Sequence, residues 1–191
     1  MEVFIDPRSF INALTVAERL KDTTRHCYTS GGRHESVAEH SWMMCLMAFL
    51  LKDEFPEVDM AKVMEMCVIH DLGECFTGDI PAFDKNAAHE EREETLLAQW
   101  VDSLPEPEGS RMRALYAEMA ARETQEAKLY KAIDALEAVQ QHNLSDLCTW
   151  IPHEYELNLR YGEDKVAFSE YLCALRAEIR KDTEKKIEEG S

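Results

Sequence analysis

The sequence predicts an all-α fold, a bundle of about six to seven helices. Apolar residues recur at helical spacing along most of the chain, and only 7 glycines and 6 prolines interrupt it. No segment shows the sustained alternation of β-branched and polar residues that is typical of strands. We expect one domain over residues 1–191, because a chain of 191 residues can bury a single sizeable core.

Turn-forming residues and capping patterns divide the chain into its expected elements. The helices are predicted near residues 7–21, 36–54, 59–75, 86–104, 110–121, 123–146 and 163–187. Breakers lie at 53–57, at the proline-rich stretch 104–109 and at Gly162. Two loops remain, at 22–35 and 76–82. Loops as long as the first are usually functional or disordered in a compact helical domain.

The charge of the chain excludes several classes of partner. It has 21 Lys and Arg against 38 Asp and Glu, which gives a formal net charge of −17. A field of that sign repels polyphosphate backbones and anionic lipids, so we expect neither nucleic-acid nor membrane binding. A small anionic substrate remains possible where a few arginines form a local positive pocket.

The cysteines and the N-terminus indicate a cytoplasmic protein. Six cysteines are scattered without a C-x-x-C pair, so we expect reduced thiols and neither a zinc knuckle nor a disulfide framework. The first ten residues, MEVFIDPRSF, lack the apolar segment of a secretory signal. The longest apolar run, Trp42 to Leu51, is too short to cross a bilayer.

A group of titratable residues follows the most apolar helix. The helix predicted over 59–75 is apolar on every side from Met66 to Ile69 and then carries His70 and Asp71. A buried imidazole and carboxylate are costly unless they are paired or bind a metal. A buried His–Asp hydrogen bond would also explain the pair, but Glu74 lies one helical turn further and stacks beside both residues.

His40 is a second candidate ligand. Ser36 to Glu39 fits the S-x-x-E capping box, so a helix should start at Ser36 and carry His40 in its first turns. There the helix dipole disfavours an imidazolium, and the neutral imidazole is the form that binds metal. The alternative is that His40 is only part of a helix start.

Asp134 is a third candidate. It lies in an amphipathic helix on the same stripe as Ala127, Tyr130 and Ala138, so it borders the packed face. The alternative is a simple i,i+3 ion pair with Lys131. The remaining histidines, among them His89, His142 and His153, show no ligand spacing, and we expect no site role for them.

Together these residues could form one metal site. His40, His70, Asp71 and Asp134 offer two nitrogens and two oxygens from three helices. Such a set suits one divalent ion (Mn, Co, Fe, Zn or, less well, Mg) and leaves positions for water and substrate. The ion would acidify its water and polarise a phosphoryl oxygen.

The order of these residues resembles a known family. His40, then His70-Asp71, then Asp134 is similar to the H…HD…D signature of the HD superfamily of metal-dependent phosphohydrolases. The flanking segments 33–41, 70–81 and 126–134 resemble the branch that contains the 5′-deoxynucleotidases. The resemblance covers residues 14–139, and the C-terminal helix adds little.

The resemblance implies roles for particular residues. His40, His70, Asp71 and Asp134 match the metal ligands, and Glu74 matches the glutamate that handles protons beside the metal-bound water. Arg25 falls at the position of a phosphate-binding arginine. The segment that contacts the sugar corresponds to Asp79, Ile80, Pro81 and Ala82.

The positive charges near the first loop agree with this assignment. Lys21, Arg25 and Arg33 concentrate cations there, and arginine offers phosphate a two-pronged set of donors. The alternative is that they only balance acids such as Asp22 and Glu35.

The resemblance implies a phosphomonoesterase that hydrolyses nucleoside 5′-monophosphates, with a homodimer possible. His26 departs from the bacterial deoxynucleotidases, which have at this position a tryptophan that crowds the sugar 2′ position. Two alternatives remain open: hydrolysis of another phosphate ester, such as a nucleoside triphosphate or cyclic nucleotide, and a non-catalytic nucleotide-binding helical module.

Overall fold

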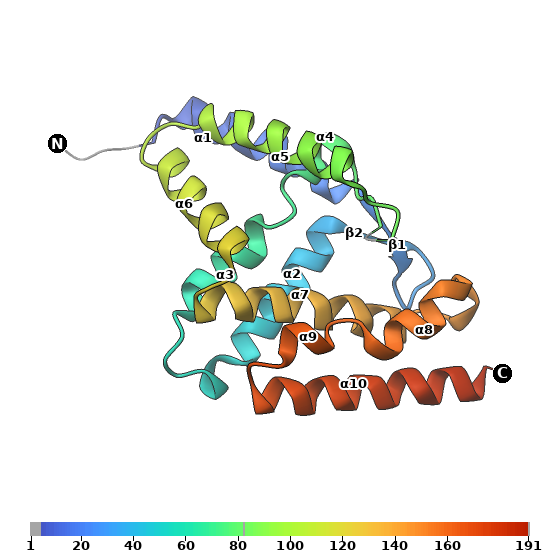
Figure 1. Cartoon of the computed structure of the whole chain (residues 1–191). Coiled ribbons are helices and arrows are strands. Elements are labelled where there is room, and N and C mark those ends of the chain that lie inside the picture. Colours follow the sequence, from blue (N-terminus) through green and yellow to red (C-terminus); the bar gives the residue numbers. More distant parts are fainter. Residues whose placement is uncertain (1–4, 82, 191) are drawn as a thin grey trace.

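A computed structural model of the protein describes residues 5–81 and 83–190 and confirms the all-α fold (Figure 1). Its helices are α1 (Pro7–Ala17), α2 (Val37–Leu50), α3 (Met60–Ile69), α4 (Glu74–Thr77), α5 (Ala87–Asp102), α6 (Glu108–Ala121), α7 (Gln125–Leu144), α8 (Pro152–Arg160), α9 (Glu163–Val166) and α10 (Glu170–Glu189). Short 3-10 turns lie at Glu18–Lys21, Lys52–Glu54 and Leu147–Thr149. The first two extend α1 and α2 toward the ends predicted for them.

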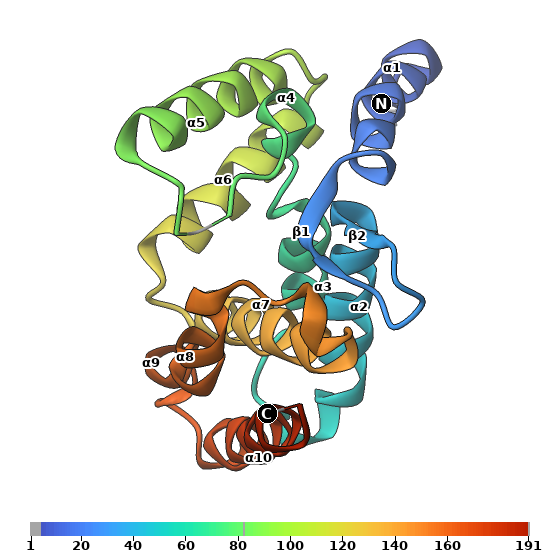
Figure 2. The same ribbon diagram turned by 90° about the vertical axis from the view of Figure 1, so that its right-hand side faces the viewer.

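Helix α7 is the centre of the fold. It packs against α2, α3 and α10. Figure 1 shows α10 running alongside α7, and in the turned view of Figure 2, where both are foreshortened, α10 again lies beneath it. Leu129, Ile133 and Leu136 of α7 have no exposed surface. The buried apolar cluster around them includes residues from Leu20 to Ile179, so distant segments share one core.

The predicted capping box sets the start of α2. The Ser36 side chain accepts a hydrogen bond from the Glu39 N–H at 3.3 Å, and the Glu39 carboxylate accepts one from the Ser36 N–H at 2.9 Å. The prediction that the helix starts here is confirmed. This cap places His40 in the first turn of α2, buried against α7.

The prediction of one continuous helix over residues 59–75 is wrong. Helix α3 ends at Ile69, whose carbonyl accepts a hydrogen bond from the Tyr116 hydroxyl at 2.6 Å. Tight turns follow, and the short helix α4 begins at Glu74. Glu74 therefore reaches the same region as His70 across a turn and not along one helix.

The first predicted loop contains a β-hairpin that the sequence did not indicate. Strand β1 (Thr24–Tyr28) pairs antiparallel with β2 (His34–Ser36), with Thr24 opposite Ser36 and Tyr28 opposite His34. Three residues of β1 thus face a single residue of β2, Glu35. This bulge disrupts the period of two that would identify a strand, and bulges often redirect side chains beside active sites.

The C-terminal region also differs from the prediction. Helix α8 was not predicted, and the helix expected over 163–187 is divided into α9 and α10. Pro152 starts α8 at a position that needs no N–H donor, and Gly162 ends the segment in the left-handed region with φ 83°. Ser169 then caps a new helix by accepting a hydrogen bond from the Leu172 N–H. No helix among residues 5–81 and 83–190 is both long and apolar enough to span a bilayer.

We expect the core around α7 to dominate stability. Leu136→Ala removes side-chain atoms from a site with 0% exposure and should lower the free energy of unfolding by about 2–5 kcal/mol. Leu144→Ala on the same helix is the control, because Leu144 is 49% exposed. Denaturant unfolding followed by circular dichroism measures both, and equal losses would contradict a core centred on α7.

Candidate active site

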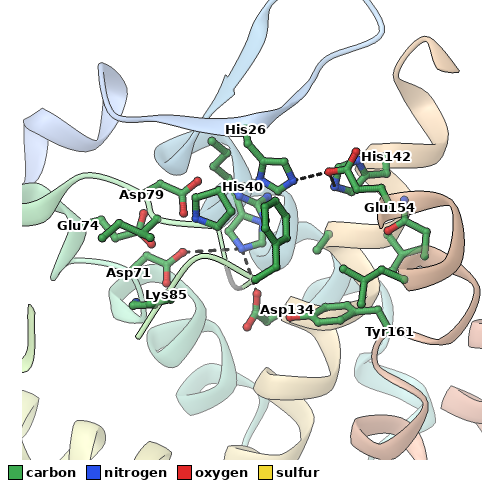
Figure 3. A pocket seen from close by; sticks show the side chains of 18 of the residues that line it. His26, His40, Asp71, Glu74, Asp79, Lys85, Asp134, His142, Glu154 and Tyr161 are labelled. Atoms are coloured by element: carbon green, nitrogen blue, oxygen red, sulfur yellow. Dashed lines mark hydrogen bonds and ion pairs between the residues drawn. The ribbon is translucent and has the colours of Figure 1, made fainter. Parts of the chain in front are cut away.

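One cavity of about 290 Å³ gathers most of the predicted site residues (Figure 3). It is bordered by the bulged strand β1, the segment after α4, and helices α7 and α8. The predicted residues that line it are Arg25, His26, His40, Asp71, Glu74, Asp79, Ile80, Pro81 and Asp134. Ala82 lies outside the described residues. The structure thus brings together residues from distant parts of the chain.

The side chains of the four predicted metal ligands lie close together. The Nε2 atom of His40 lies 3.2 Å from Asp134 Oδ1 and 3.9 Å from Asp71 Oδ2. The Nε2 atom of His70 lies 2.9 Å from Asp71 Oδ2 and 4.0 Å from Asp134 Oδ1. Asp134 is largely buried, with 15% of its side chain exposed. His70 does not line this cavity but a neighbouring one, and it belongs to the group through its contact with Asp71.

Both imidazoles are held by their other nitrogen. His40 Nδ1 lies 2.5 Å from Glu137 Oε2, and His70 Nδ1 lies 2.9 Å from the carbonyl of Cys67. Since these oxygens only accept, each Nδ1 is the donor, and each Nε2 is directed to the carboxylates. Such outer hydrogen bonds are the usual way in which proteins orient metal-binding histidines.

The group fits a divalent cation. The buried Nε2 of His70 has no hydrogen-bond partner among the described residues, although it lies 2.9 Å from Asp71, so the two atoms are not aligned for a hydrogen bond. His40, His70 and Asp71 each offer a ligand atom within 4.8 Å of the others. Two nitrogens and carboxylate oxygens without a thiolate suit Zn, Mn, Fe or Co.

Electrostatics keep the carboxylates ionised. Burial opposes the charge of Asp71, but His70 and His40 outweigh it and lower the pKa of Asp71 to about 2. Burial likewise opposes the charge of Asp134, yet Lys131 and the two imidazoles hold the pKa of its carboxyl well below its usual range.

The carboxylates around His40, and not the helix dipole as expected, dominate its pKa. Burial and Arg25 disfavour its charge, but hydrogen bonds to Asp134 and Glu137 outweigh them and raise its pKa to about 9. The effect of these carboxylates exceeds that of the helix dipole. A proton and a cation therefore compete for the same Nε2.

Glu74 lies beside the ligand group and is only 7% exposed. Its Oε2 is buried and has no hydrogen-bond partner among the described residues. Burial, followed by the charges of Asp71, Asp79 and Glu93, raises the pKa of Glu74 to about 10. A carboxyl group held in the protonated form on a cavity wall can deliver a proton.

Arg25 reaches the cavity from the bulge of β1. Its Nη1 contacts Glu35 Oε2 at 2.8 Å and Glu137 Oε2 at 3.2 Å. Arg25 therefore does balance the charge of Glu35, which the sequence analysis had left open as an alternative. The other guanidinium nitrogens make no hydrogen bond with the described residues, and they remain available to an anion.

The ion pair between Asp134 and Lys131 also forms, with 2.6 Å between Oδ2 and Nζ. It does not exclude a ligand role, because the other oxygen of Asp134 faces His40.

Arg33 does not line the cavity, although it was predicted to contact the substrate. Its Nη1 donates to Glu39 at 2.8 Å, and 62% of its side chain is exposed. The ion pair with Glu39 holds Arg33 at the surface.

Several site residues escaped the sequence analysis. Glu137 follows Asp134 by one helical turn, and that spacing could have indicated it. No local signal marked Glu154 or His142, for which no site role was expected. The structure places both on the α8 side of the cavity, where burial lowers the pKa of His142 to about 4. His26 Nε2 lies 2.7 Å from Glu154 Oε1.

Comparison with known proteins identifies the family. The HD domain family profile matches residues 17–176, and the chain belongs to this family. The protein named 5′-deoxynucleotidase HDDC2 of Homo sapiens is 31% identical over 138 residues, which are 70% of this chain and 67% of that protein. The 5′-deoxynucleotidase hdd1 of Schizosaccharomyces pombe is 27% identical over 141 residues, 70% of each chain. The resemblance seen in the motifs is confirmed.

Solved structures agree. A protein described as "Predicted metal-dependent phosphohydrolase" from Magnetospirillum magnetotacticum superposes with a TM-score of 0.78 and 29% identity, covering 94% of this chain and 93% of that chain. The cyanophage S-2L HD phosphohydrolase DatZ, bound to dA and one catalytic Zn²⁺ ion, has a TM-score of 0.57 and 22% identity, covering 92% and 96%. At 22% identity, the similarity to DatZ is evidence for a shared fold alone.

We expect Glu137 to act as a positioning residue for both His40 and Arg25. Glu137→Gln should lower Zn²⁺ affinity by about 10–100-fold, because the neutral amide supports the His40 imidazole less well. Glu35→Gln is the matched control, because Glu35 contacts Arg25 but forms no hydrogen bond to His40 in the described chain. Competition with a chromogenic chelator measures affinity, and equal Zn²⁺ affinities in the two variants would contradict this role.

Proposed function

We propose that this protein is a metal-dependent phosphomonoesterase that hydrolyses nucleoside 5′-monophosphates, deoxynucleotides among them, to nucleoside and phosphate. One observation carries the proposal: a single cavity is lined by His40, Asp71 and Asp134, by the buried Glu74 and by Arg25, and His70 contacts Asp71 from outside its lining. The similarity to proteins named 5′-deoxynucleotidases supports the substrate class.

His40, His70, Asp71 and Asp134 are the residues proposed to hold the ion. When bound, a divalent ion supplies Lewis acidity at the phosphoryl group and makes water a better nucleophile. The chain contributes orientation, because the Nδ1 contacts of both histidines fix the directions of their Nε2 atoms.

Arg25 and Glu74 are proposed to bind the phosphate and to move the proton. Arg25 would bind the phosphate oxygens through the nitrogens that Glu35 and Glu137 leave free. Water adds to phosphorus, the bond to the 5′ oxygen breaks, and that oxygen takes up a proton. We assign to Glu74 the delivery of this proton and the recovery of one from the water, which its position on the cavity wall supports. Asp79, Ile80 and Pro81 line the same cavity, and we propose that they contact the nucleoside.

Phosphate release tests the proposal. Chelator-stripped protein is reloaded with Mn, Co, Mg or Zn and given mono-, di- and triphosphates and a cyclic nucleotide. We expect release from 5′-monophosphates only after reloading. Activity confined to triphosphates or cyclic nucleotides would instead support the other phosphate esters, and a tightly bound but unhydrolysed nucleotide would support a binding module.

Glu74→Gln should lower kcat by about 10²–10⁴-fold, because the amide cannot exchange the proton. Metal content should stay near that of the native protein, since Glu74 is not among the proposed ligands. Glu94→Gln, an exposed position on α5, serves as the control. Unchanged kcat in Glu74→Gln with full metal content would remove Glu74 from proton transfer.

His26 should influence the choice between ribose and deoxyribose. An imidazole leaves more room than an indole and can hydrogen-bond a 2′-hydroxyl, so the native protein should hydrolyse AMP measurably. His26→Trp should shift the kcat/KM ratio toward dAMP by roughly ten- to two-hundred-fold. If the native protein already rejects AMP by about a thousandfold, another residue excludes the 2′-hydroxyl.

The proposed working environment follows from charge and thiols. All six cysteines are free, which suits the reducing cytoplasm. The net charge of −17 disfavours nucleic acids and anionic membranes as partners. The shared core from Leu20 to Ile179 supports one domain over residues 1–191.

We further propose that the protein is a homodimer, paired through the outer face of α2. Trp42, Phe49 and Leu50 lie at helical spacing on this face and are 61%, 63% and 70% exposed. A contiguous apolar stripe marks an interaction surface, and the same face on a second copy can pair with it about a two-fold axis. Light scattering should find a native dimer and a Trp42→Glu monomer, while Tyr171→Glu on α10 stays dimeric. A native monomer would contradict the proposal.

A further inference from the structure

A second group of metal-binding side chains lies in the same cavity, on the α8 side and away from Asp71 and Glu74 (Figure 3). His26 comes from β1, His142 from the end of α7 and Glu154 from α8. Each offers one ligand atom, and these atoms lie within 4.8 Å of one another. We propose that His26, His142 and Glu154 form a second divalent-cation site.

The distances suit a shared ion. Glu154 Oε1 lies 2.7 Å from His26 Nε2 and 3.6 Å from His142 Nε2. Donor atoms that share an ion at about 2.0–2.2 Å, with angles from right to tetrahedral, are separated by roughly 2.8–3.6 Å. Only small side-chain movements separate the present arrangement from coordination.

The protein already orients two of the three ligands. Glu154 is 1% exposed, and its second oxygen accepts a hydrogen bond from the Ile151 N–H at 2.8 Å, which leaves Oε1 toward the imidazoles. The His142 ring packs edge-on against Trp150, with 5.9 Å between ring centroids. The indole N–H of Trp150 donates to the His142 carbonyl at 3.0 Å and holds that turn in place. Such supporting contacts are typical of metal sites.

A hydrogen bond between His26 and Glu154 explains only part of this group. The ring nitrogens of His142 form no hydrogen bond with the described residues, although the neutral ring points to the same carboxylate oxygen. A cation would use the Nε2 lone pair of both rings. His26 would then be the neutral tautomer that carries its single ring proton on Nδ1.

The donor set defines the class of cation. Two imidazoles and one carboxylate suit Zn²⁺, Co²⁺, Mn²⁺ or Fe²⁺ more than Mg²⁺ or Ca²⁺. This site has three protein ligands, whereas the site at His40 and His70 has four. The second ion should therefore bind more weakly and leave positions for water or a substrate oxygen.

Co²⁺ titration of the chelator-stripped full-length protein tests the site. The heat of binding and the visible absorption of the bound Co²⁺ give the number of ions per chain. Elemental analysis of protein that has been loaded with Zn²⁺ and then desalted checks this number. We expect two equivalents in the native protein and in His89→Ala, whose imidazole lies on α5 outside the cavity. Glu154→Gln and His142→Ala should each bind one, and Asp71→Asn should retain the weaker equivalent. Circular dichroism checks that each variant is folded. If Glu154→Gln does not fold, the number of ions bound by His142→Ala decides the test.

Two results would overturn the inference. One equivalent in the native protein, lost in Asp71→Asn, would mean that His26 and Glu154 form a hydrogen-bonded pair only. A second equivalent that survives in Glu154→Gln and His142→Ala would belong to other groups, such as the exposed Cys148. Phosphate release from dAMP at one equivalent of metal, measured on the same samples, shows separately whether the proposed function stands.

Discussion

The contact between His40 and Glu137 is the interaction on which the site depends. It joins α2 to α7 across 97 residues of sequence at 2.5 Å, and each residue is 1% exposed. The same oxygen of Glu137 also lies 3.2 Å from Arg25 Nη1. Removing one partner would leave the other buried with less compensation, from Arg25 for Glu137 or from Asp134 for His40, which is destabilising. Core packing, the orientation of the proposed metal ligand His40 and the position of Arg25 therefore share one carboxylate.

The charge balance of the cavity explains why a cation belongs there. Asp71 and Asp134 face each other across two imidazoles, and burial alone would disfavour both charges. Lys131 compensates Asp134 in part, through a contact of 2.6 Å. A divalent ion would reduce the remaining repulsion and create a local positive centre in a chain of net charge −17. An anionic substrate can then approach against the overall field.

The sequence predicted what local signals encode. The capping box at Ser36 set the start of α2, and the apolar end of α3 marked the His70 side chain as buried. That helix end is not buried on every side as expected, because Val68 is 55% exposed and Asp71 is half-buried. The hairpin escaped because its bulge breaks the strand period. The links from His26 to Glu154 and from His40 to Glu137 span 128 and 97 residues, and no local pattern encodes them. The raised pKa of His40 depends on one of these links and was missed for the same reason.

A crystal structure of the protein soaked with Mn²⁺ or Zn²⁺, with anomalous scattering to locate the ion, tests the central claim most directly. The account predicts an ion bound by His40, His70, Asp71 and Asp134 at roughly 2.0–2.3 Å. It also predicts that both histidines bind through Nε2, with Nδ1 still donating to Glu137 and to the Cys67 carbonyl. An ion bound elsewhere, with Asp134 turned to solvent, would contradict the metal site and the proposed chemistry with it.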